Sequence, residues 1–185
     1  ATTRRDLVRF FRFPRRVYRG DAYWVEPILA DRLAKVDTAR NPFWRTAERE
    51  LWMALRGRVV VGTIAAIHDR RANETLHRRL GTFGFFECLD DPEAARALVA
   101  GAATWLAARG LAAMRGPYNP SADDEPGILV EGFDSLPAIM EAHAPPYYAG
   151  LLEAAGMKKH QDMFARLDEV VGVSRLGGGD DLRFI

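Results

Sequence analysis

The sequence has one cysteine and no long apolar run, and each of these absences excludes a class of protein. Cys88 alone cannot form an intrachain disulfide or a cluster of thiolate metal ligands, which is typical of a reducing compartment. No apolar run approaches the roughly 20 residues that span a bilayer. The arginine-rich first residues are not followed by the apolar core of a signal peptide. We therefore expect a cytoplasmic protein without a membrane span.

A charge of one sign is also lacking, because 26 Lys and Arg stand against 25 Asp and Glu, for a net charge of +1. This balance gives no broad electrostatic signature, so we expect neither nucleic acid nor a membrane as partner. The four histidines lie far apart without paired ligand spacing, and we expect no metal. One local set of arginines is interpreted as the solvated face of an amphipathic helix, with a polyanion site as the alternative. Its members are Arg4, Arg5, Arg9, Arg12, Arg15, Arg16 and Arg19.

The clearest structural signal is a βαβ unit between Leu80 and Pro117. Asp91 suits the N-cap of its helix, Pro92 suits the first helical position, and Gly110 suits the stop. Between these signals, apolar residues recur at spacings of three and four, the pattern of a helix packed on a sheet. A chain of 185 residues built around this unit fits a single α/β domain.

Before this unit, the sequence predicts a β-hairpin over Glu50–His68 that turns at Gly57 and Arg58. Its second arm is almost wholly apolar, which favours a central position in the sheet. Earlier still, Pro14 interrupts a helical pattern and predicts two short helices or a kink. Another short helix is expected to end near Asp37.

After this unit, residues 118–144 carry too many Pro, Gly and Asp residues for a regular element. Loops longer than about 12–15 residues are uncommon unless they are functional. A helix is predicted over Pro145–Ala155, with proline at its start and Gly156 at its stop. Met157–Asp168 is predicted to form the last strand.

This order of elements resembles the GNAT acyltransferase superfamily. The phrases NPFW, VGTIAAIHDR, GTFGFFE, DDPEAARALV, RGPYNPS, GILVEGFD and PPYYAGLLEAAG resemble more closely a bacterial family of uncharacterised GNAT-like proteins, over roughly residues 5–168. The resemblance implies that members of that family are longer chains, with a second GNAT-like domain after this one. The resemblance implies an α/β fold with a central mixed, mostly antiparallel sheet flanked by helices. It implies a GNAT-like domain over residues 1–168 without the usual first strand, and a linker or tail over 169–185 toward an absent second domain.

The resemblance also implies transfer of an acyl group from acetyl-CoA or another acyl-CoA to the amine of a small molecule or peptide. In that superfamily the pantetheine arm pairs with the fourth strand, and the pyrophosphate rests on amides at the start of the next helix. By position, the cofactor-binding roles fall to Phe85, Phe86 and Glu87 on the strand and to Cys88, Leu89, Asp90 and Asp91 at the turn.

This turn departs from the superfamily's phosphate loop, which resembles (R or Q)-x-x-G-x-(G or A). The chain reads CLDDPE, whose acids repel a pyrophosphate and whose proline lacks an amide donor. The nearest match, Arg78–Phe83, stands before the strand, and we interpret it as a simple loop rather than a phosphate site. We therefore expect the chain to bind coenzyme A poorly, no better than roughly millimolar.

A general acid is implied less directly. Many GNAT enzymes resemble one another in a tyrosine four residues before the glycine that ends the fourth helix, placed to reprotonate the thiolate. That position is Leu152 here, and Tyr147 and Tyr148 lie about one turn earlier. We assign catalysis to Tyr148, with the alternative that the tyrosine pair only packs a helix start. Cys88 is a weaker candidate nucleophile, because no histidine stands beside it in the sequence.

Carboxylates in the long loop form the remaining candidate. Asp123, Asp124 and Glu125 lie close to Asn119 and Ser121, and such groups can hold an amine or act as a base. The alternative is a solvated turn whose side chains cap nearby amides. We assign Glu125 as a second catalytic residue. Substrate contact is assigned to Asn119, Asp124, Glu125 and Tyr147.

Three functions stay open. The chain contributes a substrate groove to a two-domain N-acyltransferase, or it is a complete acyltransferase with an unorthodox phosphate site, or it is a non-catalytic, degenerate GNAT-fold module that binds a ligand or partner. We favour the first, because the resemblance covers most of the chain whereas the site motifs depart from it, and a fold does not fix chemistry. The functional surface is expected between the end of the Leu80–Glu87 strand and the Asn119–Glu125 loop.

Overall fold

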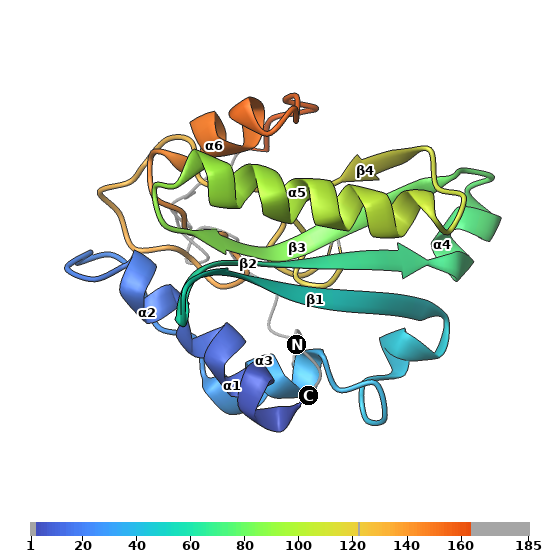
Figure 1. Ribbon diagram of the computed structural model, residues 1–185, viewed down its shortest axis with the longest axis horizontal. Helices are drawn as coiled ribbons and strands as arrows, with labels where there is room; N and C mark the ends of the chain where they lie inside the picture. The colour runs from blue at the N-terminus through green and yellow to red at the C-terminus, as the bar shows by residue number, and fades with distance from the viewer. Residues whose placement is uncertain (1–2, 122, 164–185) are drawn as a thin grey trace, which may run out of the picture.

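The computed structural model describes residues 3–121 and 123–163, and these form a mixed α/β fold (Figure 1). One sheet has the order β1–β2–β3–β4, and β1, β2 and β3 run antiparallel while β4 runs parallel to β3. The predicted central sheet, mixed and mostly antiparallel, is confirmed. Its strands are β1 (Ala47–Arg56), β2 (Val59–Asp69), β3 (Leu80–Cys88) and β4 (Ala113–Arg115).

The predicted hairpin is formed by β1 and β2, which turn at Gly57 and Arg58. The first strand begins at Ala47, three residues before the predicted start at Glu50. Nearly all of β2 is buried, as expected of a central strand. It pairs with β1 on one side and β3 on the other.

Helix α5 (Pro92–Ala107) crosses one face of the sheet and completes the predicted βαβ unit with β3 and β4 (Figure 1). Its predicted N-cap is confirmed, because the Asp91 side chain accepts a hydrogen bond from Ala94 N–H at 3.0 Å. A Cβ atom at Gly62 of β2 would lie 2.7 Å from Leu98 Cδ1. Glycine at this position therefore leaves room for the Leu98 side chain where the helix packs on the sheet. Helix α6 (Tyr148–Ala154) packs beside α5 and begins three residues later than predicted.

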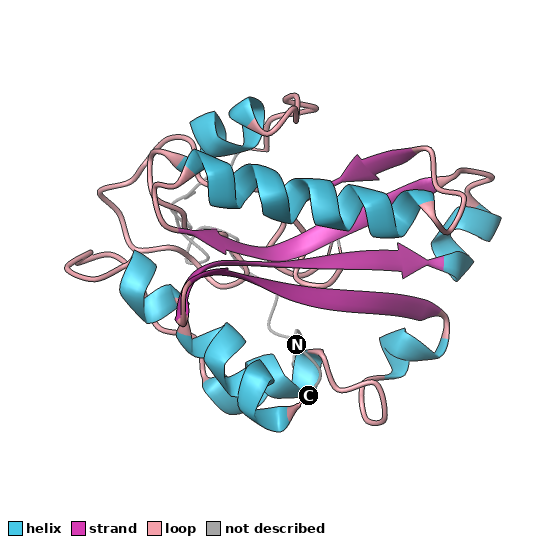
Figure 2. Cartoon of the chain, in the orientation of Figure 1, coloured by secondary structure: helices cyan, strands magenta, loops and turns pink. Residues whose placement is uncertain are grey.

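The opposite face of the sheet is covered by α1 (Arg4–Arg12), α2 (Pro14–Val17) and α3 (Leu29–Lys35) (Figure 2). Neighbouring strand residues point to opposite faces, so Ala65 packs here while Ile64 and Ala66 face α5. Pro14 divides α1 from α2 as predicted. Buried clusters therefore lie on both faces of the sheet, and the main cluster on this face contains Phe10, Val36, Leu51, Ala65 and Phe85.

Two short elements complete the described fold: the 3₁₀ helix η1 (Pro42–Arg45) and α4 (Arg70–Thr75). The predicted strand over Met157–Asp168 is wrong for residues 157–163, which form neither strand nor helix. The rest of that range and the predicted linker over 169–185 lie outside the described residues. In residues 118–121 and 123–144 there is no helix or strand, so this segment is the long loop that was predicted.

Candidate functional site

A pocket of about 340 Å³ lies where α1, the C-terminal half of β3 and the long loop meet, and we call it the loop pocket. Most of its wall is apolar, with a few polar groups among aromatic and aliphatic side chains, which is typical of ligand sites. Its apolar wall includes Phe10, Phe11, Pro14, Tyr18, Trp24, Val25, Phe85, Phe86, Ile128, Ile139 and Met140. Its polar lining includes Arg32, Thr63, Glu87, Asn119, Glu125 and Tyr148.

A β-bulge in β3 forms one side of the loop pocket. The register between β2 and β3 shifts there, and Phe85 has a φ of 47°, which is uncommon for a residue with a side chain. At this point, hydrogen bonds with side chains replace the backbone hydrogen bonds between β2 and β3. Thr63 Oγ1 donates to Phe85 O at 3.1 Å, and Asn119 Oδ1 accepts from Phe85 N–H at 2.6 Å. The bulge thereby joins the strand to the long loop.

The start of the long loop lies directly against β3. Tyr118 N–H donates to Phe83 O at 2.8 Å. A Cβ atom at Gly84 would lie 1.6 Å from Tyr118 O, a distance that no side chain can occupy. Glycine at this position is therefore required for the loop to follow the strand and form a wall of the pocket.

Glu87 and Tyr148 form the chemically distinctive pair of the pocket. Tyr148 is only 1% exposed, and its hydroxyl donates to Glu87 Oε2 at 2.6 Å while accepting from Cys88 N–H at 2.8 Å. Burial raises the pKa of Glu87 to about 7, although the hydrogen bond from Tyr148 opposes this rise. Burial also holds the pKa of Tyr148 well above its ordinary value, so its hydroxyl keeps its proton. The pair therefore contains a carboxyl group that changes charge near neutral pH.

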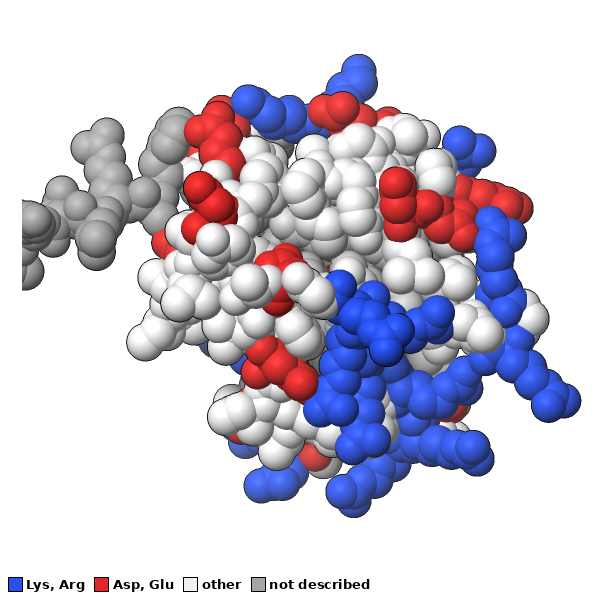
Figure 3. Space-filling view, turned by 90° about the vertical axis from the view of Figure 1, so that its left-hand side faces the viewer, with Lys and Arg blue, Asp and Glu red and all other residues white. Residues whose placement is uncertain are grey.

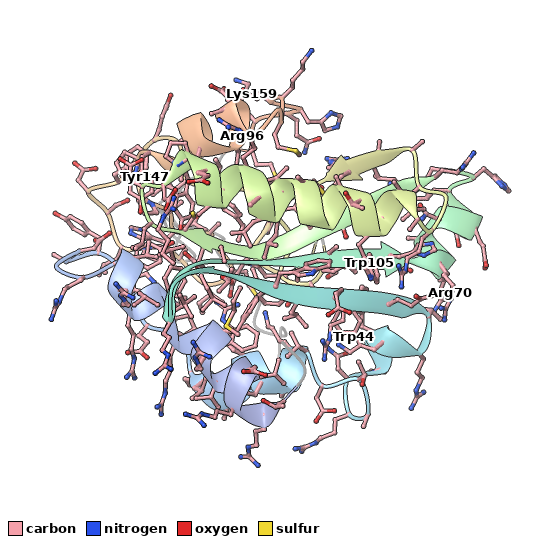
Figure 4. The ribbon with its side chains drawn as sticks, in the orientation of Figure 1. Trp44, Arg70, Arg96, Trp105, Tyr147 and Lys159 are labelled. Carbon is pink, nitrogen blue, oxygen red and sulfur yellow. The ribbon has the colours of Figure 1, made fainter. Side chains whose placement is uncertain are left out.

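Tyr147 and Cys88 have structural contacts. Tyr147 Oη donates to Cys88 O at 3.0 Å, so two neighbouring tyrosines satisfy both backbone groups of Cys88. Figure 4 shows Tyr147 at the end of the sheet where α5 begins. Burial raises the pKa of the Cys88 thiol to about 12, with Asp91 and Glu87 adding to the effect. A thiol that stays protonated is a poor nucleophile, which argues against that role for Cys88.

The loop carboxylates are paired with cations from α3. Glu125 Oε2 lies 2.7 Å from Arg32 Nη2, and Asp124 Oδ1 lies 2.8 Å from Lys35 Nζ. Asn119 Nδ2 also donates to Glu125 at 3.3 Å. A carboxylate fixed in this way holds the loop against α3, whereas proton transfer would have to break the ion pair. We therefore prefer Glu87 to Glu125 as a base.

The turn between β3 and α5 does not fit the pyrophosphate of an acyl-CoA. Asp91 already caps the helix, and Pro92 has no N–H to offer. Arg56 binds Asp91 at 2.8 Å and Glu93 at 2.7 Å, and its hydrogen bond is the main cause that lowers the pKa of Asp91 to about 2. Asp91 thus stays charged, and an incoming phosphate meets its negative charge where an anion site needs free N–H groups.

The loop pocket contains only part of the predicted site. Tyr148, Glu125 and Asn119 line it, together with Phe85, Phe86 and Glu87 on β3. Asp124, Tyr147, Cys88, Asp90 and Asp91 do not line it. Leu89 lines a different pocket, together with Arg15, Arg16 and Arg19.

Sequence reasoning missed Tyr18, Arg32 and Thr63 as pocket residues. Tyr18 Oη donates to His143 O at 3.1 Å, across 125 positions of sequence, so no local pattern signals this contact. Arg32 is the single arginine of the short helix α3, and its buried Nη1 has no hydrogen-bond partner among the described residues. Buried donors of this kind are usually hydrogen-bonded, so Arg32 is a candidate contact for the oxygen of a ligand or of a water molecule.

Residues 3–121 and 123–163 contain no group of three or more His, Cys, Asp or Glu side chains that could hold a metal ion. Within these same ranges, no helix has the length and apolar character needed to cross a membrane.

Two curated proteins are similar to this chain. It is 37% identical over 161 residues to a bacterial ceramide synthase of Caulobacter vibrioides (strain NA1000 / CB15N), a match that covers 86% of this chain and 42% of that protein. It is 33% identical over 160 residues to Protein YghO of Escherichia coli (strain K12), covering 86% of this chain and 41% of that protein. No family model and no solved structure matches. The chain thus spans about two fifths of the length of the curated relatives it matches.

Proposed function

We propose that this chain is part of a GNAT-type N-acyltransferase and that its loop pocket binds the amine that receives the acyl group. The GNAT resemblance and the mixed sheet support this assignment. So does the similarity to a protein named ceramide synthase, because a ceramide is an amide between a fatty acid and a long-chain amino alcohol. Its synthesis is therefore the acylation of a lipid amine.

The observation that carries the proposal is Glu87, a carboxyl group with a pKa of about 7 on the wall of a largely apolar pocket. An amine is protonated at neutral pH and must lose a proton before its nitrogen can attack an acyl carbon. A base whose pKa lies near the working pH performs this step best. Glu87 takes that proton in its ionised form.

Tyr148 has a positioning role in this proposal. Its hydroxyl holds one oxygen of Glu87 at 2.6 Å, and the Cys88 backbone holds the hydroxyl in turn. A tyrosine whose pKa is raised does not readily give up its proton, so it is less suited to the role of general acid. Glu125 keeps Arg32 in place from the other side of the pocket.

The pocket wall favours an amine that carries a hydrocarbon chain over a peptide amine. Phe11, Trp24 and Ile139 contribute apolar surface to the same pocket that Glu87 and Arg32 line. A lipid amine with a nearby hydroxyl fits this arrangement, because the free Nη1 of Arg32 can donate to that oxygen while Glu87 receives the amine proton.

An acyl-CoA remains the proposed acyl donor, and a second GNAT-like domain remains the proposed partner that holds it. The turn before α5 lacks the free amides that a pyrophosphate needs. The same observation favours one other candidate, a non-catalytic module that binds a lipid amine without acylating it.

The test uses the protein at its full natural length, with palmitoyl-CoA and sphinganine as the acyl donor and long-chain amine. Amide formation is followed by mass spectrometry, and amine binding is measured separately by calorimetry. We expect both, and we expect Glu87→Gln to remove amide formation while leaving binding measurable. Glu50→Gln on β1 is the matched control, because Glu50 does not line the loop pocket. Binding without amide formation supports the non-catalytic module, and absence of both refutes the proposal.

A further inference from the structure

We propose that the end of the molecule formed by α1, α2 and two apolar loops docks on an anionic lipid membrane. This inference goes beyond amine acylation. It is tested by vesicle binding without turnover, so it stands or falls separately from the role of Glu87. It also replaces the expectation, drawn from net charge alone, that the chain has no membrane partner.

The first observation is a concentration of arginine. Residues 4–19 contain seven arginines and a single acid, Asp6, whereas the whole chain has a net charge of only +1. Figure 3 shows a basic field on the end of the molecule where α2 lies, and Arg15, Arg16 and Arg19 come together there. Acidic side chains border this field, and Glu26 pairs with Arg15. Arg12 and Arg19 have no carboxylate partner in the described part of the chain and are exposed.

The second observation is a hollow within the basic field. Arg15, Arg16 and Arg19 line a pocket of about 340 Å³ together with Leu89. Arg16 is held in place because its Nη1 donates to Val60 O at 3.2 Å. Guanidinium groups bind phosphate in a directed way. Three of them around one hollow therefore match a lipid phosphate better than scattered surface arginines do.

The third observation is a set of aliphatic side chains exposed on two neighbouring loops. Ile139 is 94% exposed, Ile28 is 68% exposed and Val25 is 59% exposed. Single exposed aliphatic residues are normal, but Ile139 and Val25 also line the loop pocket, whose other wall is α1. The apolar loop tips and the basic helices are thus parts of one continuous surface.

Together these features match the two signals that stable membrane attachment requires, apolar side chains that enter the headgroup region and basic groups that bind anionic lipids. The loop pocket then opens next to the membrane, so a lipid amine can enter it without its hydrocarbon chain crossing water. A nucleic acid is also a polyanion, but binding to its phosphates does not require exposed aliphatic side chains beside the arginines.

The experiment measures sedimentation of the full chain with phosphatidylcholine vesicles, with and without phosphatidylglycerol. Each arginine near an anionic membrane strengthens binding by roughly fivefold, so Arg12→Glu with Arg19→Glu is expected to weaken binding at least about 25-fold. Ile139→Asp is expected to weaken it several-fold. The matched controls are Arg71→Glu and Leu76→Asp, two exposed residues at α4, at the opposite end of the sheet (Figure 1).

The proposal predicts binding only to vesicles that contain phosphatidylglycerol, and unchanged binding by both controls. Failure of the unaltered chain to sediment with anionic vesicles overturns it. Equal losses in the controls and in the test variants overturn it as well, because the effect then belongs to total charge or folding. Binding to an RNA oligonucleotide that Ile139→Asp leaves intact, without vesicle binding, assigns the arginines to nucleic acid instead.

Discussion

The α5 face of the sheet and the loop pocket are built by different means. The α5 face is a sealed apolar layer, in which Ala95, Leu98 and Ala102 repeat along one helix and meet a strand whose glycine lets the helix approach. The loop pocket instead lies where the buried clusters of the two faces meet beside β3, because Phe10 and Phe85 belong to the other face whereas Phe86 and Tyr148 belong to the α5 side. It is assembled from short segments far apart in sequence, and it contains Glu87, a carboxyl group whose pKa burial raises to about 7. The comparison teaches that regular periodicity gives this molecule its frame, while its chemistry lies where that periodicity ends.

The sharpest way to break this comparison is to remove the titrating group from the pocket. Glu87→Gln keeps the shape of the side chain but cannot accept the amine proton, so we expect amide formation to fall by roughly 10²–10⁴-fold. The measurement is the initial rate of amide formation at pH 8. A rate close to that of the unaltered protein contradicts the role of Glu87 as base.

A substitution on the α5 face is expected to lower the free energy of unfolding without changing amine binding. Leu98 is 4% exposed, and Leu98→Ala leaves a cavity between helix and sheet that should lower the free energy of unfolding by about 2–5 kcal/mol. Chemical denaturation measures this loss. At temperatures where the variant is folded, amine binding should be unchanged, because Leu98 does not line the loop pocket. A variant that loses binding while fully folded shows that the α5 face and the loop pocket are coupled.

The pocket has its own effect on stability, and that effect depends on pH. The native pKa of Glu87 is about 7, above its ordinary value of 4.5, so the folded protein holds a proton that the unfolded chain has lost between these pH values. The free energy of unfolding should therefore fall as pH rises from about 4.5 to about 7. Glu87→Gln should remove this decline, so its melting temperature should exceed that of the unaltered chain at pH 8 and match it near pH 4. Parallel curves for the two proteins rule this linkage out.

The Tyr148→Phe variant tests whether the Tyr148 hydroxyl positions Glu87 or whether the residue only packs in the core. Tyr148→Phe keeps the ring but leaves Glu87 and the Cys88 N–H without the hydroxyl, which should cost about 1–3 kcal/mol of stability. Since the Tyr148 hydrogen bond lowers the pKa of Glu87, its loss should move the rise of the pH–rate profile to higher pH. Tyr23→Phe is the control, because Tyr23 is exposed and does not line the pocket. A profile that stays in place means that the hydroxyl only supports packing.

The sequence predicted the frame well because its signals are local. Asp91, Pro92 and Gly110 mark the ends of a helix within a short stretch, and Gly57 with Arg58 marks a turn between two apolar runs. The last predicted strand is wrong over residues 157–163 because these residues are mostly polar and lack the apolar alternation of a strand that packs on a core.

The candidate site was only partly predictable for a related reason. The loop and the tyrosine pair could be found as unusual composition, but the partner of Tyr148 could not, because its contact with Glu87 crosses 61 positions. Glu87 was predicted to bind a cofactor through its backbone, and nothing local indicates that its side chain is buried. Burial, which sets its pKa, is a property of the assembled fold.

The covering of the β3 edge has a consequence for the behaviour of the protein in concentrated solution. Beyond Thr82, where pairing with β4 ends, the polar groups of this edge meet the long loop and the tyrosine pair: Tyr118 at Phe83, Asn119 at Phe85, and Tyr147 with Tyr148 at Cys88. An uncovered edge is a template on which a second molecule adds its own strand, and such additions grow into aggregates. The groups that cover this edge, of which Asn119 and Tyr148 also line the loop pocket, therefore keep the β3 edge from pairing with a strand of a neighbouring molecule.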